Sequence, residues 1–160
     1  MRMVPMAEAD LDAVLAVQAA CYPRAMREAA DVVRARLRAS PDTVLVARDA
    51  DGICAYLFAY PSRLGKVTPL GGDFTLPDTP DTLYLHDLAV APRAAGQGVA
   101  RRLVDAMLAR AGRLRHSALV SVQDSRRFWE NLGYAAAAGD GAALATYPAG
   151  ALYMARRLSA

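Results

Sequence analysis

Hydrophobic and polar residues recur along the chain with the periods of helices and strands. Residues 8–21 and 27–39 place apolar residues three or four positions apart, as amphipathic helices do, and a proline lies just beyond each run. Helical spacing returns most clearly over 98–111 and briefly over 125–132, and a glycine directly follows each of these runs. The sequence therefore predicts helices over these four segments.

Short apolar runs bounded by turn residues predict strands. The predicted strands are 43–48, 53–60, 83–90, 118–122, a run from 134 onward and 152–158. Asp49–Gly52 joins the first two, and its Asp-Gly pair supplies the positive φ of a hairpin turn. Because helices and strands interleave, we expect an α/β (α+β) fold, with one domain over residues 1–160.

Composition narrows the class of protein. The chain is 54% hydrophobic and 22% charged, which is typical of a globular domain. The longest apolar run, 53–60, is too short to span a membrane, and the N-terminus has no apolar signal region. We therefore expect a cytoplasmic protein without a membrane partner.

Cysteine, histidine and charge narrow the ligand chemistry. The two cysteines have no motif spacing and the two histidines, His86 and His116, are far apart, so we expect no metal site. The net charge is +3 and the pI about 9.1, which suits an anionic ligand such as a nucleotide cofactor. The arginines form no long basic run, so a nucleic-acid partner is not expected.

The most specific pattern is 83–100, where a strand runs into a turn with Gly96 and Gly98 and a helix then begins. Amides at a helix N-terminus carry the positive end of its dipole, and glycine allows a close ligand. The turn is therefore suited to phosphate, although an ordinary strand–helix turn has the same glycines. A dinucleotide fingerprint fails at Arg101, and a Walker loop fails at Val99.

These residues resemble the GNAT superfamily of N-acetyltransferases. The family signature, Arg/Gln-x-x-Gly-x-Gly/Ala after Leu-x-Val-x-Pro, matches Arg93, Gly96 and Gly98 after Leu88–Pro92. A second family pattern, an aromatic pair, three residues, glycine and an aromatic, matches Phe128–Tyr134. The resemblance implies a mixed, mostly antiparallel central sheet that is flanked by helices and splayed at the signature strand.

The resemblance also implies acetyl-CoA (coenzyme A) as cofactor. The amides of residues 95–100 would cradle its diphosphate, and the Leu88 and Val90 backbone would pair with the pantetheine arm as an added strand does. The Leu88 amide would polarise the thioester carbonyl, and Ser125 would contact pantetheine or simply cap a helix. The implied cofactor-binding residues are Leu88, Ala89, Val90, Arg93, Ala95, Gly96, Gln97, Gly98, Val99, Ala100, Arg101, Ser125, Phe128 and Trp129.

An amine is protonated at neutral pH, so its attack on a thioester requires a base. His86 is the first candidate because the ordinary pKa of histidine, about 6.5, suits the task, although a core histidine is the plainer interpretation. Asp87 is the second candidate: it faces the other side of a regular strand unless a bulge turns it, or it orients a neighbouring group. The catalytic candidates are His86, Asp87 and Leu88.

One position departs from the family pattern. Many members have a tyrosine four residues before the second motif's glycine, as the acid for the departing thiolate, and here that residue is Trp129. Indole donates a hydrogen bond but does not titrate usefully. We expect Trp129 to pack against the pantetheine end, with Tyr84, Tyr147 or Tyr153 as the alternative acids.

The expected activity is N-acetyl transfer from acetyl-CoA to a small-molecule or peptide amine by direct attack on the thioester. Trp129 also fits a catalytically weak CoA-binding module, and the basic pI also fits an acyltransferase acting on an RNA-linked amine. The acceptor would lie over 20–30 and 61–82, the least patterned stretches, with Cys21 and Tyr22 lining its cleft. Both a monomer and a homodimer are compatible with the sequence.

Overall fold

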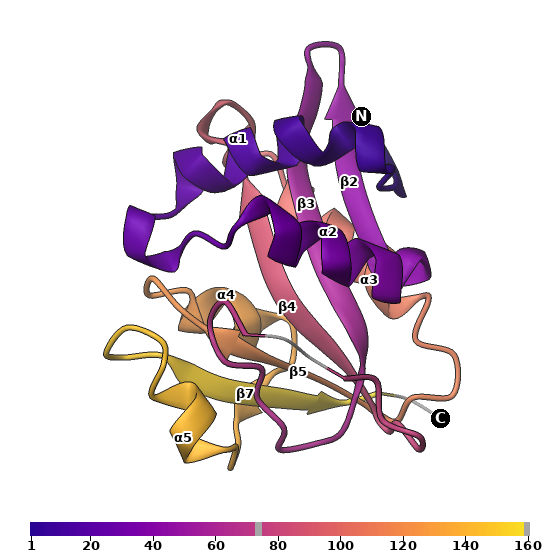
Figure 1. Cartoon of the computed structure of the whole chain (residues 1–160). Coiled ribbons are helices and arrows are strands. Elements are labelled where there is room, and N and C mark those ends of the chain that lie inside the picture. Colours follow the sequence, from indigo (N-terminus) through magenta and orange to yellow (C-terminus); the bar gives the residue numbers. More distant parts are fainter. Residues whose placement is uncertain (73–74, 159–160) are drawn as a thin grey trace. The chain divides into compact units, whose positions relative to one another are not determined.

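The computed structural model describes residues 1–72 and 75–158 (Figure 1). The chain forms two compact units that interleave in sequence. Unit 1 comprises Met1–Ala59 and Asp87–Arg110, and unit 2 comprises Tyr60–His86 and Ala111–Ala160. The helices are α1 (Leu11–Cys21), α2 (Ala30–Ala39), α3 (Val99–Leu108), α4 (Arg126–Asn131) and α5 (Gly141–Leu144). The strands are β1 (Arg2–Pro5), β2 (Val44–Asp49), β3 (Gly52–Ser62), β4 (Thr82–Val90), β5 (His116–Ser121), β6 (Ala135–Ala136) and β7 (Leu152–Arg157).

The strands follow the order β1-β2-β3-β4 in unit 1 and β3-β4-β5-β7-β6 in unit 2, because β3 and β4 run through both. The pairs β1–β2, β2–β3, β5–β7 and β6–β7 are antiparallel. β4 and β5 are parallel and pair from Thr82↔His116 to Leu85↔Leu119, whereas β4 itself continues to Val90. This mixed, mostly antiparallel sheet with flanking helices confirms the predicted fold class.

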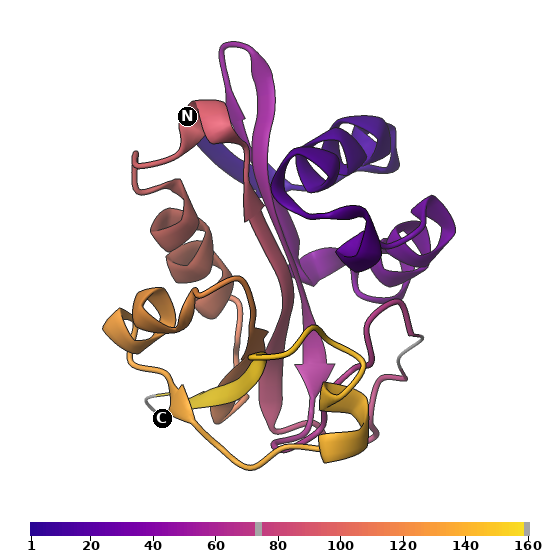
Figure 2. The same ribbon diagram turned by 90° about the vertical axis from the view of Figure 1, so that its left-hand side faces the viewer.

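In unit 1, α1 and α2 lie on one face of the strands and α3 lies on the other (Figure 2). Alternate strand residues, such as Val44 and Val46 of β2 and Tyr56 and Phe58 of β3, join the core beneath α1 and α2. α3 buries Val99, Leu103, Val104 and Met107, which recur at the helical period. The long periodic patterns of the sequence thus mark the faces that are buried.

In unit 2, aromatic residues form much of the core. One cluster of buried residues consists of Tyr60, Val67, Tyr84, Ala118, Ala143 and Tyr153. The segment between β3 and β4 contains no further helix or strand among its described residues, as predicted, and Gly65 O accepts a hydrogen bond from Asp140 N at 2.9 Å. The backbone of that loop is therefore tied to the segment that leads into α5.

Two short elements differ from the sequence prediction. No strand was expected before residue 8, yet β1 pairs with β2 along its whole length; four residues ending in proline are too short to show an alternation. The segment after 134 was expected to hold only strands and a loop, yet it contains α5. Asp140 caps that helix by accepting from the amides of Ala142 and Ala143. No helix in the described ranges is both long and apolar enough to cross a bilayer.

Candidate functional site

The turn between β4 and α3 is shaped by two left-handed glycines. A short 3₁₀ turn at Pro92–Ala94 leads into Gly96 and Gly98, whose φ angles are 75° and 74°. A Cβ added to either glycine would meet nothing within 4 Å, so the backbone conformation, and not crowding, requires glycine here. Residues 95–98 are exposed, so the turn presents its backbone to a ligand.

The start of α3 offers a set of backbone donors. Gly98 is the N-cap and supplies no side-chain cap, and the first helical bond runs from Arg102 N to Gly98 O. The first-turn amides therefore have no acceptor within the helix, and the backbone amides of 96–101 donate to no other backbone acceptor in the described part of the chain. These amides carry the positive end of the helix dipole, which favours an anion such as a diphosphate.

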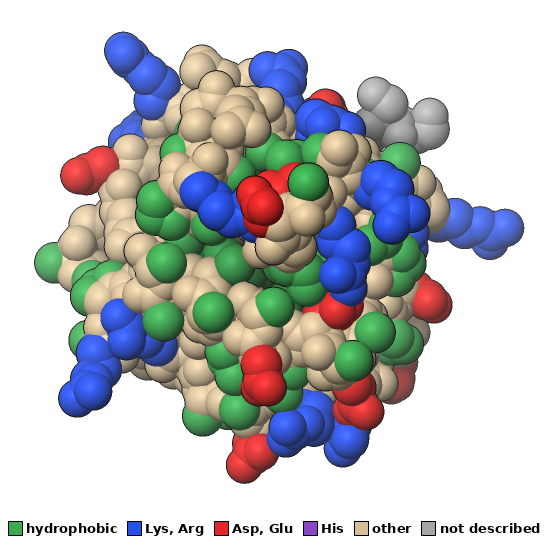
Figure 3. Space-filling view, turned by 90° about the horizontal axis from the view of Figure 1, so that it is seen from above, with side chains coloured by type: hydrophobic (Ala, Val, Ile, Leu, Met, Phe, Trp, Pro, Cys, Tyr) green, Lys and Arg blue, Asp and Glu red, His purple; other side chains and the backbone are tan. Residues whose placement is uncertain are grey.

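The Arg93 side chain is held by the protein itself. Its Nη1 lies 2.5 Å from Asp49 Oδ2, and its Nη2 donates to Ile53 O at 3.3 Å. The guanidinium lowers the pKa of the Asp49 carboxyl, and the carboxylate raises the pKa of Arg93. Arg93 thus ties the turn to the β2–β3 hairpin. On the face drawn in Figure 3, basic side chains are scattered among acidic and apolar ones.

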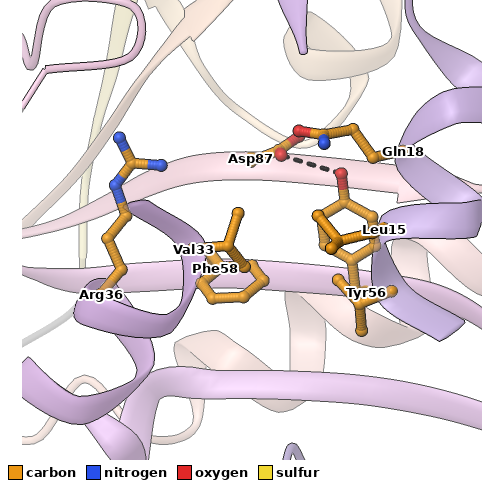
Figure 4. Close-up of a pocket in the computed structure, with 8 residues that line it drawn as sticks. Leu15, Gln18, Val33, Arg36, Tyr56, Phe58 and Asp87 are labelled. Carbon is orange, nitrogen blue, oxygen red and sulfur yellow. Dashed lines mark hydrogen bonds between the residues drawn. The ribbon is translucent and has the colours of Figure 1, made fainter. Parts of the chain in front are cut away.

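Asp87 is the acceptor for two tyrosines. Tyr22, which follows α1, donates to Asp87 Oδ1 at 2.9 Å. Tyr56 of β3 donates to Asp87 Oδ2 at 2.8 Å (Figure 4). Burial, and next the Asp87 charge, raise the pKa of both phenols well above 10. The two phenols therefore stay neutral and keep their protons at physiological pH.

The pocket beside Asp87 is small and mostly apolar. Its lining residues are Val14, Leu15, Gln18, Val33, Arg36, Tyr56, Phe58 and Asp87. The cavity has a volume of about 10 Å³, which is room for roughly one water molecule. This space is too small for an acceptor substrate as it stands.

A buried ion pair fixes the segment that carries Tyr22. Arg36 Nη1 and Nη2 lie 2.5 and 2.6 Å from the two carboxylate oxygens of Glu28. The Gln18 side chain bonds the Glu28 backbone twice, at 3.1 and 3.0 Å. A bidentate pair with these extra bonds holds the segment after α1 in one conformation.

The end of α1 also reaches the backbone of β4. The Tyr22 hydroxyl lies 2.9 Å from Leu88 O, and Cys21 Sγ lies 3.1 Å from Val90 O. Ala91 N donates to Cys54 O of β3 at 2.7 Å. Because backbone groups of successive strand residues point to alternate edges, those of Leu88 and Val90 face away from β3. Tyr22 and Cys21 thus lie at the edge of β4 that faces away from β3, its outer edge.

His86 belongs to unit 2 and has different surroundings. Its Nδ1 lies 3.1 Å from the Tyr60 hydroxyl, which also contacts the Thr68 hydroxyl. The Tyr60 and Tyr84 rings lie 5.8 and 6.1 Å from the imidazole, between centroids. The side chain is partly exposed, so one imidazole nitrogen is held by a hydroxyl while the ring keeps access to solvent.

Trp129 is packed within unit 2. It is 6% exposed, and its ring meets Phe128 and Tyr134 edge-on at 4.9 and 5.5 Å between centroids. Ser125 occupies the N-cap position of α4, but its side chain does not cap that helix; it donates to Val122 O at 2.7 Å. The cap that was the alternative role for Ser125 is therefore absent: its hydroxyl bonds back to Val122 O and accepts from no amide of α4.

The three tyrosines named from the sequence as alternative acids are either hydrogen-bonded within the fold or buried. Tyr147 donates to Thr68 O at 2.8 Å, and Tyr153 accepts from Gly65 N at 2.8 Å. Tyr84 is 1% exposed. Tyr56 and Tyr60, which contact Asp87 and His86, were given no role from the sequence, since a buried aromatic residue on a strand looks like ordinary core.

Known proteins resemble this chain in sequence and in fold. The profile of the acetyltransferase (GNAT) family matches residues 11–134. The L-2,4-diaminobutyric acid acetyltransferase of Chromohalobacter salexigens is 34% identical over 91 residues, which are 55% of this chain and only 40% of that protein. The chain therefore spans less than half of that relative.

Two solved structures share the fold at low identity. The GphF GNAT-like decarboxylase in complex with isobutyryl-CoA aligns with a TM-score of 0.86 and 17% identity over 99% of this chain and 100% of that one. A GNAT family acetyltransferase from Brucella melitensis in complex with acetyl-CoA aligns with a TM-score of 0.64 and 17% identity over 99% and 88%. At these identities the likeness concerns the fold.

Proposed function

Because the chain belongs to the acetyltransferase (GNAT) family, we propose that it is an acetyl-CoA-dependent N-acetyltransferase that acts on a primary amine of a small molecule or peptide. One observation carries this proposal. The exposed turn at Gly96 and Gly98 opens α3 with a row of backbone amides and no capping side chain. Such a row suits the diphosphate of a CoA thioester.

The cofactor would lie along the end of β4 and the turn that follows. The amides of 96–101 hold the diphosphate, since the Ala95 amide already donates to Pro92 O, and the outward backbone groups of Leu88 and Val90 pair with the pantetheine arm. The exposed Arg101 side chain faces a phosphate of the adenosine end. Ser125, Phe128 and Trp129 stay predicted cofactor contacts. The relatives solved with isobutyryl-CoA and acetyl-CoA support this choice of cofactor.

His86 is our choice of base. Both carboxylate oxygens of Asp87 accept phenol hydrogen bonds, which favours a positioning role for Asp87. The His86 imidazole is held through Nδ1 by the Tyr60 hydroxyl, and Nε2 then takes the proton from the attacking amine. The Leu88 amide, two residues further along β4, stabilises the oxyanion that forms at the thioester carbon.

The acceptor proposal starts from the curated relative. The compound in that protein's name, L-2,4-diaminobutyric acid, is a small amino acid with a second amine. A short diamine of this kind is the first acceptor to test, and larger amines and peptide N-termini follow.

Release of CoA thiol over a panel of amines tests the proposal. We expect release that requires an amine, and a loss of about 10²- to 10⁴-fold in kcat for His86→Asn with CoA affinity retained. His116→Asn is the matched control because it removes the only other histidine of the sequence. Tight CoA binding with no turnover on any amine would instead indicate a CoA-binding module, and thiol release without an amine would indicate other thioester chemistry.

A further inference from the structure

We propose that Tyr22 is the general acid that protonates the departing CoA thiolate, an inference that rests on the proposed function. An acid beside the sulfur assists the departure of the thiolate, and the indole of Trp129 does not titrate usefully. Tyr22 brings a phenol to the outer edge of β4, with its hydroxyl 2.9 Å from Leu88 O. That edge is the one to which we assign the thioester.

The position of the hydroxyl follows from strand geometry. In a strand the N–H and C=O of one residue point to the same edge. The Leu88 carbonyl that Tyr22 contacts and the Leu88 amide that we assign to the oxyanion therefore share an edge. The sulfur is bonded to the carbon whose oxygen that amide would hold, so a hydroxyl at this edge lies on the side of the leaving group.

Tyr22 has one hydroxyl proton and two acceptors within hydrogen-bond distance of it. One phenol proton faces two acceptors, Asp87 Oδ1 and Leu88 O, each 2.9 Å from the phenol oxygen. A proton that is shared in this way is not locked into either bond, and a third acceptor can compete for it. Tyr56 differs, since its hydroxyl donates to Asp87 Oδ2 and its side chain is fully buried.

Tyr22 supplies its proton as the tetrahedral intermediate collapses. The C–S bond of the tetrahedral intermediate breaks, its electron pair stays on sulfur, and the Tyr22 O–H proton passes to sulfur to form the thiol. The phenolate regains a proton from solvent water through the Asp87 carboxylate, whose Oδ1 lies 2.9 Å away. The amine proton leaves through His86. A thiol of pKa about 8.5 needs only modest help to depart, so we expect the acid to contribute about 10- to 100-fold.

A pair of tyrosine variants tests the assignment. Tyr22→Phe and Tyr56→Phe each remove one phenol bond to Asp87, but only the first removes a hydroxyl from the β4 edge. We expect Tyr22→Phe to lower kcat about 10- to 100-fold, with KM and the CoA dissociation constant within about threefold. We expect Tyr56→Phe to lower kcat less than about threefold. Equal losses in the two variants, or a Tyr22→Phe loss confined to KM, would overturn the assignment.

A fluorinated tyrosine separates acid strength from structure. 3-Fluorotyrosine at position 22 keeps the hydroxyl and both its bonds but makes the phenol more acidic. We expect kcat to rise with unchanged KM, whereas an unchanged kcat would exclude proton donation. This variant also answers the question if Tyr22→Phe fails to fold. Wild-type protein that acetylates no amine would defeat the proposed function itself, whereas active wild type with insensitive Tyr22 variants would defeat only this inference.

Discussion

The glycine turn before α3 and the Asp87 cluster are built on opposite physical principles. The turn is made of consecutive residues, presents backbone amides to solvent and contributes little packing. The cluster joins Tyr22, Tyr56 and Asp87, which lie more than 30 positions apart along the chain, through side-chain bonds in a partly buried place. The backbone amides of the turn can bind an anion. The hydrogen bonds of the cluster keep its phenols protonated and fix the packing of three distant segments.

This difference separates binding from stability. Exposed amides at a helix start are already solvated, so losing a ligand there costs the fold little. Buried phenols that lose their acceptor cost the full desolvation of the group, about 1–3 kcal/mol each. Changes in the cluster should therefore lower the free energy of unfolding most, and changes in the turn should lower cofactor affinity most.

The largest expected effect on stability comes from Asp87→Ala. Tyr56 loses its acceptor and Tyr22 keeps only Leu88 O, so we expect the free energy of unfolding to fall by about 2–4 kcal/mol. Urea unfolding at neutral pH measures this change. Asp87→Asn is the control, because it keeps one oxygen acceptor and should recover part of the loss. If the free energy of unfolding fell by less than about 1 kcal/mol, the distinction between the two regions would be lost.

Paired glycine variants probe the turn. Gly96 and Gly112 both have positive φ, 75° and 59°, and an added Cβ meets nothing within 4 Å at either. Each change to alanine should therefore cost about 1–2 kcal/mol of stability through the left-handed backbone. We expect Gly96→Ala alone to weaken CoA binding, by about tenfold or more, in a calorimetric titration. Equal affinity losses in both variants would show that strain, and not the turn, controls binding.

Alkaline pH should remove the stability that the cluster phenols contribute. The pKa of the Tyr56 phenol is raised well above its usual value of 10, so above that pH the unfolded chain loses this proton while the folded chain retains it. Stability therefore falls as pH rises beyond about 10, by about 1.4 kcal/mol per unit for each such phenol. Tyr56→Phe should make the fall between pH 8 and pH 11 shallower by about 1.4 kcal/mol in urea unfolding.

A second tyrosine calibrates that measurement. Burial raises the pKa of Tyr134 to about 12, and its hydroxyl donates to Ser117 in unit 2. Tyr134→Phe should reduce the alkaline fall by a similar amount, since its folded pKa also exceeds 11. Parallel curves for wild type and Tyr56→Phe would contradict the raised pKa of the cluster.

Two arginines give the smallest expected effects. Arg93 is held by Asp49, whereas Arg101 is exposed and has no ion pair among the described residues. We expect Arg93→Ala to change the CoA dissociation constant by less than about threefold, and Arg101→Ala to raise it about three- to tenfold at low salt. A larger effect at Arg93 than at Arg101 would mean that the Asp49 pair opens when the cofactor binds.

The same contrast explains what the sequence predicts and what it does not. The turn was predicted because its signal lies within consecutive residues, and the run over 98–111 matches α3 because ten helical residues show their period. The cluster was not predicted, because the pairing of Tyr22 and Tyr56 with Asp87 depends on how α1 and β3 pack on β4. Short β1 and α5 were missed for a related reason, since their neighbours and caps stabilise them more than their own patterns do.

The most direct test of the central claim follows the backbone amides themselves. In a ¹⁵N–¹H NMR titration with CoA, we expect the largest shift changes at the amides of Gly96 to Arg101, and almost none at Gly112 or Gly133. Binding that leaves the 96–101 amides unmoved, or no binding at all, would contradict the account.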